Sequence, residues 1–579
     1  MQQASKPEAA EASASLGDLD TFIERAMADW RCPGMALAVA QDGAIVYQRG
    51  FGQRDRERDL PVTEQTLFAI GSCTKAFTTA SLALLVDEGK LDWDAPARTY
   101  LPDFALRDRF ASERISPRDL VTHRSGLPRH DALWYGSPLS RDELVARLRH
   151  LQPNADFRTR WQYQNLMYLT AGYLAGRVAG MEWEAFVQQR LLDPLGMANA
   201  NFSVDRSQAA DDAALPYQDL HGTVRRMAFR NLDAIAPAGS MNASIADMAA
   251  WLLLHLNRGK HDDERIISET QIAEMHAPQM VMPDDRRFAE VTLPTYALGW
   301  FVESYKGRAV VSHGGNIDGF SALVSLMPRE GIGVVALTNL NGIPLPEIVA
   351  SSVYDRLLGL PATPWNDRFL KLRDEVEAAG EQSKSKGEAD RVANTSPSHR
   401  LADYAGEYAD PGYGALTIGH DGDALSLRYN AFAGPLQHRH YDTFEFLWEQ
   451  EDERFPCTFA TDAAGRVASV AIPFEPAVAD IVFVRQPPAA MTEPAFLDRF
   501  VGAYELMGVT LTVARKGAAL WLSIPGQPDY ELEPAHGTAF RLKGRGPEFG
   551  IEFQTDERGD VAAALVTQPN AVFTARKIG

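Results

Sequence analysis

Apolar and polar positions follow different patterns in different parts of this chain, and the changes of pattern divide it into regions. Near the start, residues 19–30 have the spacing of an amphipathic helix. Two short apolar runs then lie on either side of an Asp42-Gly43 turn, which predicts a β-hairpin. A longer apolar run, 75–86, predicts a buried helix that ends near Gly89.

The next stretch is rich in loops and helices, and its clearest element is an apolar helix predicted over 166–178. Three short apolar runs follow, at 309–313, 320–327 and 332–338, and glycine-rich turns separate them. These runs predict strands. Helices around such a sheet, with a helical insertion, predict an α/β domain that we place at 18–365.

The composition changes after this domain. Residues 367–379 predict a charged helix, and 380–400 are rich in Ser, Lys, Glu and Asn, which predicts a linker. We therefore assign 366–400 to a helix and linker. Beyond it, short alternating runs with frequent glycine turns predict an all-β region. At the other end, residues 1–17 are small and polar and are expected to form a disordered arm.

The all-β region contains an internal sequence similarity, which we call the internal echo. Tyr404-Ala-Gly-Glu-Tyr408 resembles Phe500-Val-Gly-Ala-Tyr504, and further short matches follow in the same order. The echo predicts two small barrel-like β-domains in sequence, at 401–488 and 491–579. Chance similarity between alternating strands is the alternative explanation, and under it the region is still all-β.

Charge and hydropathy exclude some classes of partner. The chain has 57 basic and 77 acidic residues, a formal net charge of -20, and no basic stripe, so we expect no nucleic-acid partner. No run approaches the roughly 18 apolar residues of a membrane span, and no leader-like segment opens the sequence. We expect a cytoplasmic protein, or a periplasmic one if a native leader has been removed.

Candidate metal ligands and disulfides are scarce. Three cysteines in 579 residues do not form a disulfide framework, and neither H-E-x-x-H nor paired cysteines occur, so no metal or cofactor is expected. The oligomeric state stays open, and a homo-oligomer is compatible with the sequence.

The strongest chemical signal is Ser72-Cys-Thr-Lys75, at the head of the predicted helix. Positions i and i+3 share a helix face, so the Lys75 amine would lie beside the Ser72 hydroxyl. Lys75 can activate the serine as a base if its pKa is lowered. A serine N-cap with a solvated lysine is the alternative. Ser383-Lys-Ser-Lys386 repeats the pattern in a polar stretch, and we interpret it as linker.

Tyr163-Gln-Asn165 is the second motif. A tyrosine near two cationic groups can have a lowered pKa, so Tyr163 would share proton transfer with Lys75. Asn165 would hydrogen-bond Lys75 and the substrate amide. The alternative for Tyr163 is an ordinary core tyrosine.

His313-Gly314-Gly315 is the third motif, at the end of a predicted strand. The two glycines let a ligand approach the backbone closely. His313 would donate to the Tyr163 phenolate or help to position substrate, and a turn residue is the alternative. The backbone N–H groups of Asn316 and Ser72 would form an oxyanion hole.

In this order the motifs resemble the serine β-lactamase-like superfamily, which includes class C β-lactamases, D-Ala-D-Ala carboxypeptidases, D-aminopeptidases and related esterases (the S12 peptidase group). The resembling segments are 68–75, 119–127, 157–167, 194–197, 237–240 and 313–315. The resemblance implies an antiparallel sheet flanked by helices, with a helical subdomain. It also implies that Ser72 is acylated, that Lys75 and Tyr163 handle protons, and that Asn165 and the Asn316 N–H assist.

One departure from the superfamily concerns the third motif. Penicillin-recognising members carry Lys-Thr-Gly where this chain has His313-Gly-Gly315, which argues against β-lactamase activity. The His-x-Gly version and the β-domains are similar to those of D-aminopeptidases. We therefore predict a serine peptidase or amidase that acts on short or unusual peptides. A carboxylesterase and an acyl-binding sensor without turnover are the alternatives, so the expected partner is a small peptide, amide or ester.

Overall fold

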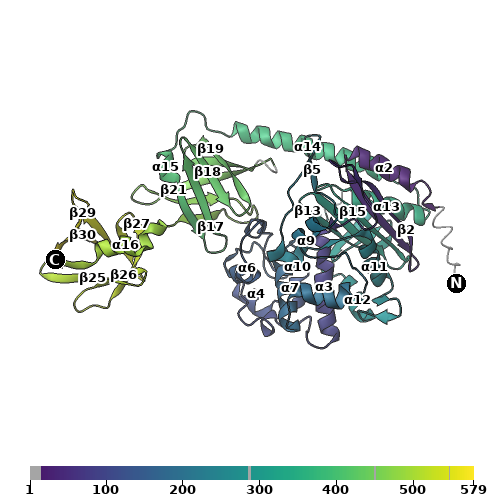
Figure 1. Cartoon of the computed structure of the whole chain (residues 1–579), viewed down its shortest axis with the longest axis horizontal. Helices are drawn as coiled ribbons and strands as arrows, with labels where there is room; N and C mark the ends of the chain where they lie inside the picture. The colour runs from purple at the N-terminus through teal and green to yellow at the C-terminus, as the bar shows by residue number, and fades with distance from the viewer. Residues whose placement is uncertain (1–14, 285–287, 449–451, 547, 579) are drawn as a thin grey trace. The chain divides into compact units, whose positions relative to one another are not determined.

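The computed structural model describes residues 15–284, 288–448, 452–546 and 548–578, so most of the predicted N-terminal arm lies outside the described part. The largest sheet has nine antiparallel strands in the order β10-β11-β12-β13-β14-β15-β1-β2-β3 (Figure 1). Its strands are β1 (Gly34–Gln41), β2 (Ala44–Asp55), β3 (Leu60–Pro61), β10 (Met280–Val281), β11 (Val291–Tyr296), β12 (Phe301–Tyr305), β13 (Arg308–Ile317), β14 (Phe320–Met327) and β15 (Ile332–Thr338). The predicted hairpin and the three predicted closing strands are confirmed.

Helices cover both faces of this sheet, which is why its central strands β14 and β15 are buried at every position. Met35, Leu37 and Val39 share a core with α2 (Leu19–Asp29) and α13 (Leu345–Leu357). On the opposite face, a Cβ on Gly333 would meet Leu252 of α11 (Ile245–Leu256) at 2.8 Å. The α/β class predicted for this domain is therefore confirmed, with an antiparallel sheet.

A helical part lies between β3 and β10. Its helices are α3 (Thr74–Asp87), α4 (Arg109–Arg114), α5 (Pro117–Leu120), α6 (Arg141–Arg147), α7 (Asn165–Ala179), α8 (Trp183–Val187), α9 (Val204–Ala209), α10 (Ala236–Gly239), α11 and α12 (Glu269–His276). α3 and α7 pack against each other, and α10 contacts both. Ser72 lies in a single tight turn, Gly71–Cys73, immediately before α3. Ser72 therefore lies where α3, α10 and the sheet meet.

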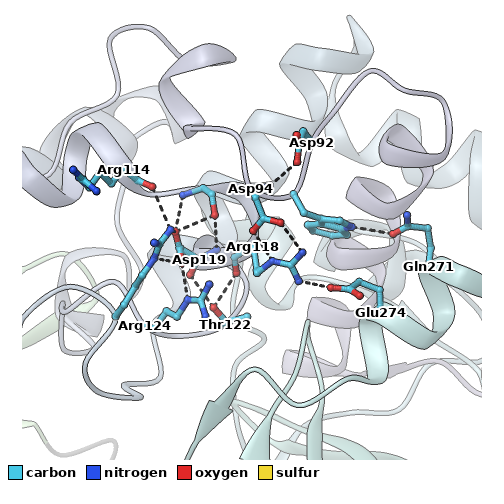
Figure 2. A network of polar contacts seen from close by, with 12 residues as sticks. Asp92, Asp94, Arg114, Arg118, Asp119, Thr122, Arg124, Gln271 and Glu274 are labelled. Atoms are coloured by element: carbon cyan, nitrogen blue, oxygen red, sulfur yellow. Dashed lines mark hydrogen bonds and ion pairs between the residues drawn. The ribbon is translucent and has the colours of Figure 1, made fainter.

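A network of ion pairs holds the loop-rich stretch around α5 (Figure 2). The carboxylate of Asp119 is fully buried and accepts from Arg124 at 2.6 Å and from Arg158 at 2.7 Å. Arg118, one position earlier, binds Asp94 at 2.7 Å and also Glu274 of α12. Because a buried charge is costly unless it is paired, these contacts fix the backbone that continues into the active-site loop.

Three strands and one helix differ from the sequence-based expectations. Strands β10, β11 and β12 were not predicted, because they are short and only partly buried, with weak alternation. α14 spans Trp365–Ala389, ten residues beyond the end of the helix predicted at 367–379. The residues interpreted as linker include Glu, Gln, Lys and Ala, which favour helix, and each of the two glycines at 380 and 387 costs only about 1 kcal/mol.

The all-β region forms two closed eight-stranded antiparallel barrels, as predicted. The first comprises β16 (Gly406–Asp410), β17 (Gly414–Asp421), β18 (Ala424–Tyr429), β19 (Phe432–His440), β20 (Thr443–Trp448), β21 (Glu453–Thr461), β22 (Val467–Ile472) and β23 (Ile481–Arg485). The second comprises β24 (Gly502–Leu506), β25 (Val509–Lys516), β26 (Ala519–Ser523), β27 (Tyr530–His536), β28 (Ala539–Leu542), β29 (Gly550–Thr555), β30 (Val561–Gln568) and β31 (Ala571–Ile578).

The internal echo has a structural counterpart in the two barrels. Tyr408 donates its hydroxyl hydrogen to the carbonyl of Tyr404 at 2.7 Å, and Tyr504 donates to Phe500 at 2.7 Å. Each tyrosine is fully buried and lies in the first strand of its barrel. The same local contact at matching positions supports the interpretation of the echo as a repeated unit.

Three observations concern disulfides, metal sites and membrane-spanning helices. Cys32, Cys73 and Cys457 are buried and unpaired. Among the residues that the structure describes, no cluster of three or more His, Cys, Asp or Glu side chains could hold a metal ion. None of the helices in the described ranges is long and apolar enough to cross a membrane.

Candidate active site

The Ser72 and Lys75 side chains meet as the i, i+3 spacing predicts. Nζ of Lys75 donates to Oγ of Ser72 at 2.8 Å and to the carbonyl of Ala238 in α10 at 2.8 Å. Lys75 is fully buried. Burial, and secondly the positive charge of Arg129, lower the pKa of Lys75 well below its usual value. The amine is therefore available in its neutral form, which can accept a proton.

Tyr163 joins these two groups from the loop that precedes α7. Its hydroxyl hydrogen-bonds Ser72, and its ring centroid lies 4.8 Å from Lys75 Nζ and 5.0 Å from the Arg129 guanidinium carbon. Two basic side chains therefore lie against the Tyr163 ring.

The pKa of Tyr163 nevertheless moves opposite to the expected direction. Burial raises it above its ordinary value, although the Ser72 hydrogen bond and Arg129 act to lower it. Desolvation of a phenolate outweighs the two favourable contacts. Of the two groups, Lys75 is therefore the better base in the resting site, and Tyr163 is a neutral donor.

Asn165 lies in the site with a different partner from the one expected. Its Nδ2 donates to Oδ1 of Asp131 at 3.1 Å, whereas Nζ of Lys75 donates to Ser72 and to the carbonyl of Ala238. Asn165 begins α7 and is nearly buried. Its amide is therefore tied to the loop that carries Asp131, and the expected contact with Lys75 is not made.

His313 is buried at the centre of β13, and its ring faces different partners from those expected. Nε2 lies 3.1 Å from the hydroxyl of Tyr296, and Nδ1 lies 2.6 Å from the carbonyl of Gly314. The rings of His313 and Tyr163 have centroids 6.3 Å apart. Burial, with the nearby Lys75 charge, lowers the pKa of His313 to about 3, so its imidazole is neutral. Both ring nitrogens thus contact groups other than Tyr163.

Gly315 of the third motif and Gly71 of the turn allow β13 to lie directly against Ser72. A Cβ on Gly315 would stand 1.9 Å from the carbonyl oxygen of Ile70 and 3.1 Å from the backbone nitrogen of Ser72. A Cβ on Gly71 would stand 2.9 Å from the backbone nitrogen of Asn316. Only glycine permits this approach, and it brings the backbone nitrogens of Ser72 and Asn316 to the same place.

The edge of β13 beside Ser72 is open on one side. β14 pairs with β13 as far as Ile317, whereas the pairing of β12 with β13 ends at Ser312. In the described part of the chain, the β12 side of β13 is therefore unpaired by β12 at residues 313–317. An exposed strand edge can pair with an extended backbone.

Arg129 and Asp131 were not predicted as site residues, yet they flank Ser72 and Tyr163. Nε of Arg129 contacts Oδ2 of Asp131 at 2.5 Å, and Trp134 donates to Oδ1 at 2.7 Å. Both residues follow closely on the 119–127 segment, so a wider reading of that segment would have included them.

His123 was considered a loop anchor and left out of the site. Its ring lies 4.3 Å from the Tyr163 ring, and its Nδ1 accepts the backbone N–H of Gln164 at 3.0 Å. Its φ of 57° is in the left-handed region. These contacts are those expected of a residue that anchors the loop, and they place His123 against the ring of Tyr163.

Two cavities meet at Ser72. One, of about 630 Å³, is also lined by Tyr163, His313 and Asn316, and the other, of about 280 Å³, by Asp131 and Asn165. Arg129 borders both. A larger cavity of about 880 Å³ between α6, α7 and α8 contains none of the candidate groups, so size alone does not identify the site.

Two segments from the first barrel's loops belong to the same compact unit as the sheet, namely 411–413 and 474–480. The backbone N–H of His130 donates to Glu475 at 2.7 Å, and Nδ1 of His130 lies 2.7 Å from the Tyr413 hydroxyl. His130 stands between Arg129 and Asp131, so these segments support the backbone at the mouth of the site.

Two family models and several known proteins resemble this chain. Residues 19–351 match the model of the family described as Beta-lactamase, and residues 390–485 match a domain of unknown function, DUF3471. The unguisins hydrolase ungD' of Aspergillus campestris is 29% identical over 69% of this chain and 77% of its own length.

Solved structures show the same fold. The octameric penicillin-binding protein homologue from Pyrococcus abyssi is 25% identical, with a TM-score of 0.55 over 81% of this chain and 99% of its own. A D-amino acid amidase from Ochrobactrum anthropi SV3 is 21% identical, with a TM-score of 0.51 over 59% of this chain and 99% of its own.

Proposed function

This chain belongs to the beta-lactamase family, and on that premise we propose that it is a serine hydrolase that cleaves amide bonds of short or unusual peptides. The observation that carries the proposal is the contact of Ser72 with both a buried lysine and a half-buried tyrosine. A serine hydroxyl becomes an effective nucleophile when a base of lowered pKa can take its proton.

The proposed reaction begins with neutral Lys75. As Ser72 Oγ bonds to the carbonyl carbon, its proton passes to Lys75, and the oxyanion forms near the backbone nitrogens of Ser72 and Asn316. The proton then returns through Tyr163 to the leaving nitrogen as the carbon–nitrogen bond breaks, and an acyl-enzyme remains. Water hydrolyses that ester by the same proton route in reverse.

One structural observation supports a peptide-like substrate. The open edge of β13 at 313–317 suits an extended backbone, which could pair with it as an added strand. The unguisins hydrolase is named for the hydrolysis of unguisins, and we extend only the hydrolase class to this chain. The absence of the Lys-Thr pair from the third motif argues against β-lactam hydrolysis as the main activity.

The test compares p-nitroanilides of D- and L-residues with the matching p-nitrophenyl esters. Ser72→Ala should abolish turnover and fluorophosphonate labelling, and Tyr163→Phe should slow the amide reaction by about 10²–10⁴. Ser383→Ala is the matched control, because it alters the other Ser-x-x-Lys copy and should keep the wild-type rate.

Three results would contradict the proposal. Ester turnover without amide cleavage would favour the carboxylesterase, and stable labelling of Ser72 without any turnover would favour an acyl-binding protein. Full amide activity in Ser72→Ala would remove Ser72 from the chemistry altogether.

A further inference from the structure

A chain of four hydrogen-bond contacts runs behind the active site, from the helical part of the domain to β13. The Tyr168 hydroxyl contacts the carbonyl of Val121 at 2.6 Å and the Tyr296 hydroxyl at 3.1 Å. The Tyr296 hydroxyl contacts Nε2 of His313 at 3.1 Å, and Nδ1 of His313 contacts the Gly314 carbonyl at 2.6 Å. All three side chains are at least 99% buried, so water does not complete the chain.

The hydrogens in this chain can be counted. Both ends are carbonyl oxygens, which only accept. Two tyrosines and one neutral histidine supply three hydrogens for the four contacts. One contact must therefore lack a hydrogen of its own.

The distances show which contacts share a hydrogen. The two outer contacts measure 2.6 Å, and two acceptors do not face one another at that distance, so Tyr168 carries its hydrogen toward Val121 and His313 is the Nδ1–H tautomer. The two inner contacts measure 3.1 Å and share the single hydroxyl hydrogen of Tyr296. Tyr296 therefore divides one hydrogen between Tyr168 and His313.

The His313 end of the chain bears on the catalytic geometry. Gly314 is followed by Gly315, whose backbone lies so close to the Ser72 turn that a Cβ would meet Ile70 at 1.9 Å. The imidazole holds the carbonyl of Gly314 through Nδ1–H, and its other nitrogen has Tyr296 as its hydrogen-bond partner. A rotation of the imidazole would release that carbonyl and the strand edge next to it.

We propose that Tyr296 is a positioning residue of this active site, whose hydroxyl hydrogen holds the His313 imidazole on Gly314 and so fixes the β13 edge beside Ser72. The proposal rests on the proposed hydrolase function for its kinetic consequence. Its hydrogen-bond arrangement can be measured without any activity.

The test uses two variants that each remove one hydroxyl from the same buried chain. In Tyr296→Phe, Nε2 of His313 loses its partner, and kcat for an amide substrate should fall about tenfold or more while KM stays within about threefold. In Tyr168→Phe, the hydrogen of Tyr296 goes wholly to His313, so kcat should stay within about threefold of wild type. A purely structural role predicts equal losses, since both variants delete a buried tyrosine hydroxyl.

A spectroscopic measurement shows, independently of turnover, whether the Tyr296 hydroxyl donates its hydrogen to Nε2 of His313. In protein labelled with ¹⁵N-histidine, and assigned with a His313→Gln sample, the Nε2 resonance should move in opposite directions in the two variants. In Tyr296→Phe, Nε2 of His313 no longer accepts a hydrogen bond from the Tyr296 hydroxyl. In Tyr168→Phe, Nε2 accepts that hydroxyl hydrogen without sharing it with Tyr168.

Equal kinetic losses in the two variants, an unchanged kcat in Tyr296→Phe, or an Nε2 resonance that moves in neither would overturn the proposal. Hydrolysis that persists in Ser72→Ala would instead defeat the proposed function, and the resonance would still decide the hydrogen-bond arrangement.

Discussion

Lys75 shows how burial rather than residue type sets the chemistry of a side chain. A charged ammonium loses its hydration when it is buried, and the Lys75 amine donates to a hydroxyl and to a carbonyl, neither of which carries a full negative charge. Arg129 adds a second positive charge nearby, which disfavours the ammonium further. The amine is therefore poised to act as a base, whereas the same burial keeps Tyr163 protonated.

The pH profile tests this account of Lys75. If neutral Lys75 is the active base, kcat/KM rises with pH through the lowered pKa of Lys75, and activity is lost on the acid side. Arg129→Gln removes a positive charge, so the pKa of Lys75 should rise and the acid limb should move to higher pH. Arg129→Lys keeps the charge and should leave the limb near its wild-type position. Measurements of kcat/KM from pH 5 to 10 decide the matter, and an unmoved limb in Arg129→Gln would exclude the electrostatic role.

At the scale of elements, the site depends on one contact between a strand and a turn. β13 lies so close to the Gly71–Cys73 turn that neither Gly71 nor Gly315 has room for a Cβ. The turn belongs to the helical part and β13 belongs to the sheet, so this contact sets the position of Ser72 relative to the strand edge. Neither element would hold that position alone.

Gly315→Ala should separate the strand from the turn. Its methyl group would overlap Ile70, whose carbonyl oxygen lies 1.9 Å from the Cβ position, so the variant should lose about 1–3 kcal/mol of stability and label slowly with fluorophosphonate. Gly314→Ala is the matched variant for folding, because its Cβ would meet nothing nearer than the carbonyl of Ala322 at 3.7 Å. Thermal melting compares the two. Equal melting temperatures and a wild-type labelling rate in Gly315→Ala would show that the contact is not needed.

At the scale of the whole molecule, two neutral histidines, one buried (His255) and one half-buried (His276), make stability depend on pH. His255 of α11 and His276 of α12 contact each other at 3.1 Å, and burial lowers the pKa of His276 to about 4 and that of His255 well below its usual value. An unfolded histidine has a pKa of about 6.5. Below that pH the unfolded chain binds more protons than the folded one, so acid favours unfolding.

We expect the free energy of unfolding to fall as the pH drops from about 6.5 toward 4, by on the order of 3 kcal/mol for His276 alone. Urea unfolding followed by tryptophan fluorescence at pH 7, 6 and 5 measures the slope. His276→Gln is the matched variant, and it should flatten the slope in this range. A free energy that stays constant between pH 7 and 5 would contradict the prediction.

Much of the fold follows from local patterns. β14 and β15 have the bounds expected of them, the helix after Ser72 ends close to Gly89 as expected, and the Tyr404-to-Tyr408 echo anticipated a repeated barrel. β11 and β12 escaped prediction because a partly buried strand is stabilised by its neighbours in the sheet, which its own sequence does not specify.

What the sequence determined by itself is the contact of Ser72 with Lys75, since a fixed rise and turn along one helix place them together. Only the tertiary structure decided what those groups can do. The direction of the Tyr163 pKa, the approach of Arg129 and the partners of His313 all depend on residues distant in the sequence, and on how completely they exclude water. Desolvation and close packing are properties of the folded assembly of elements, so no local pattern contains them.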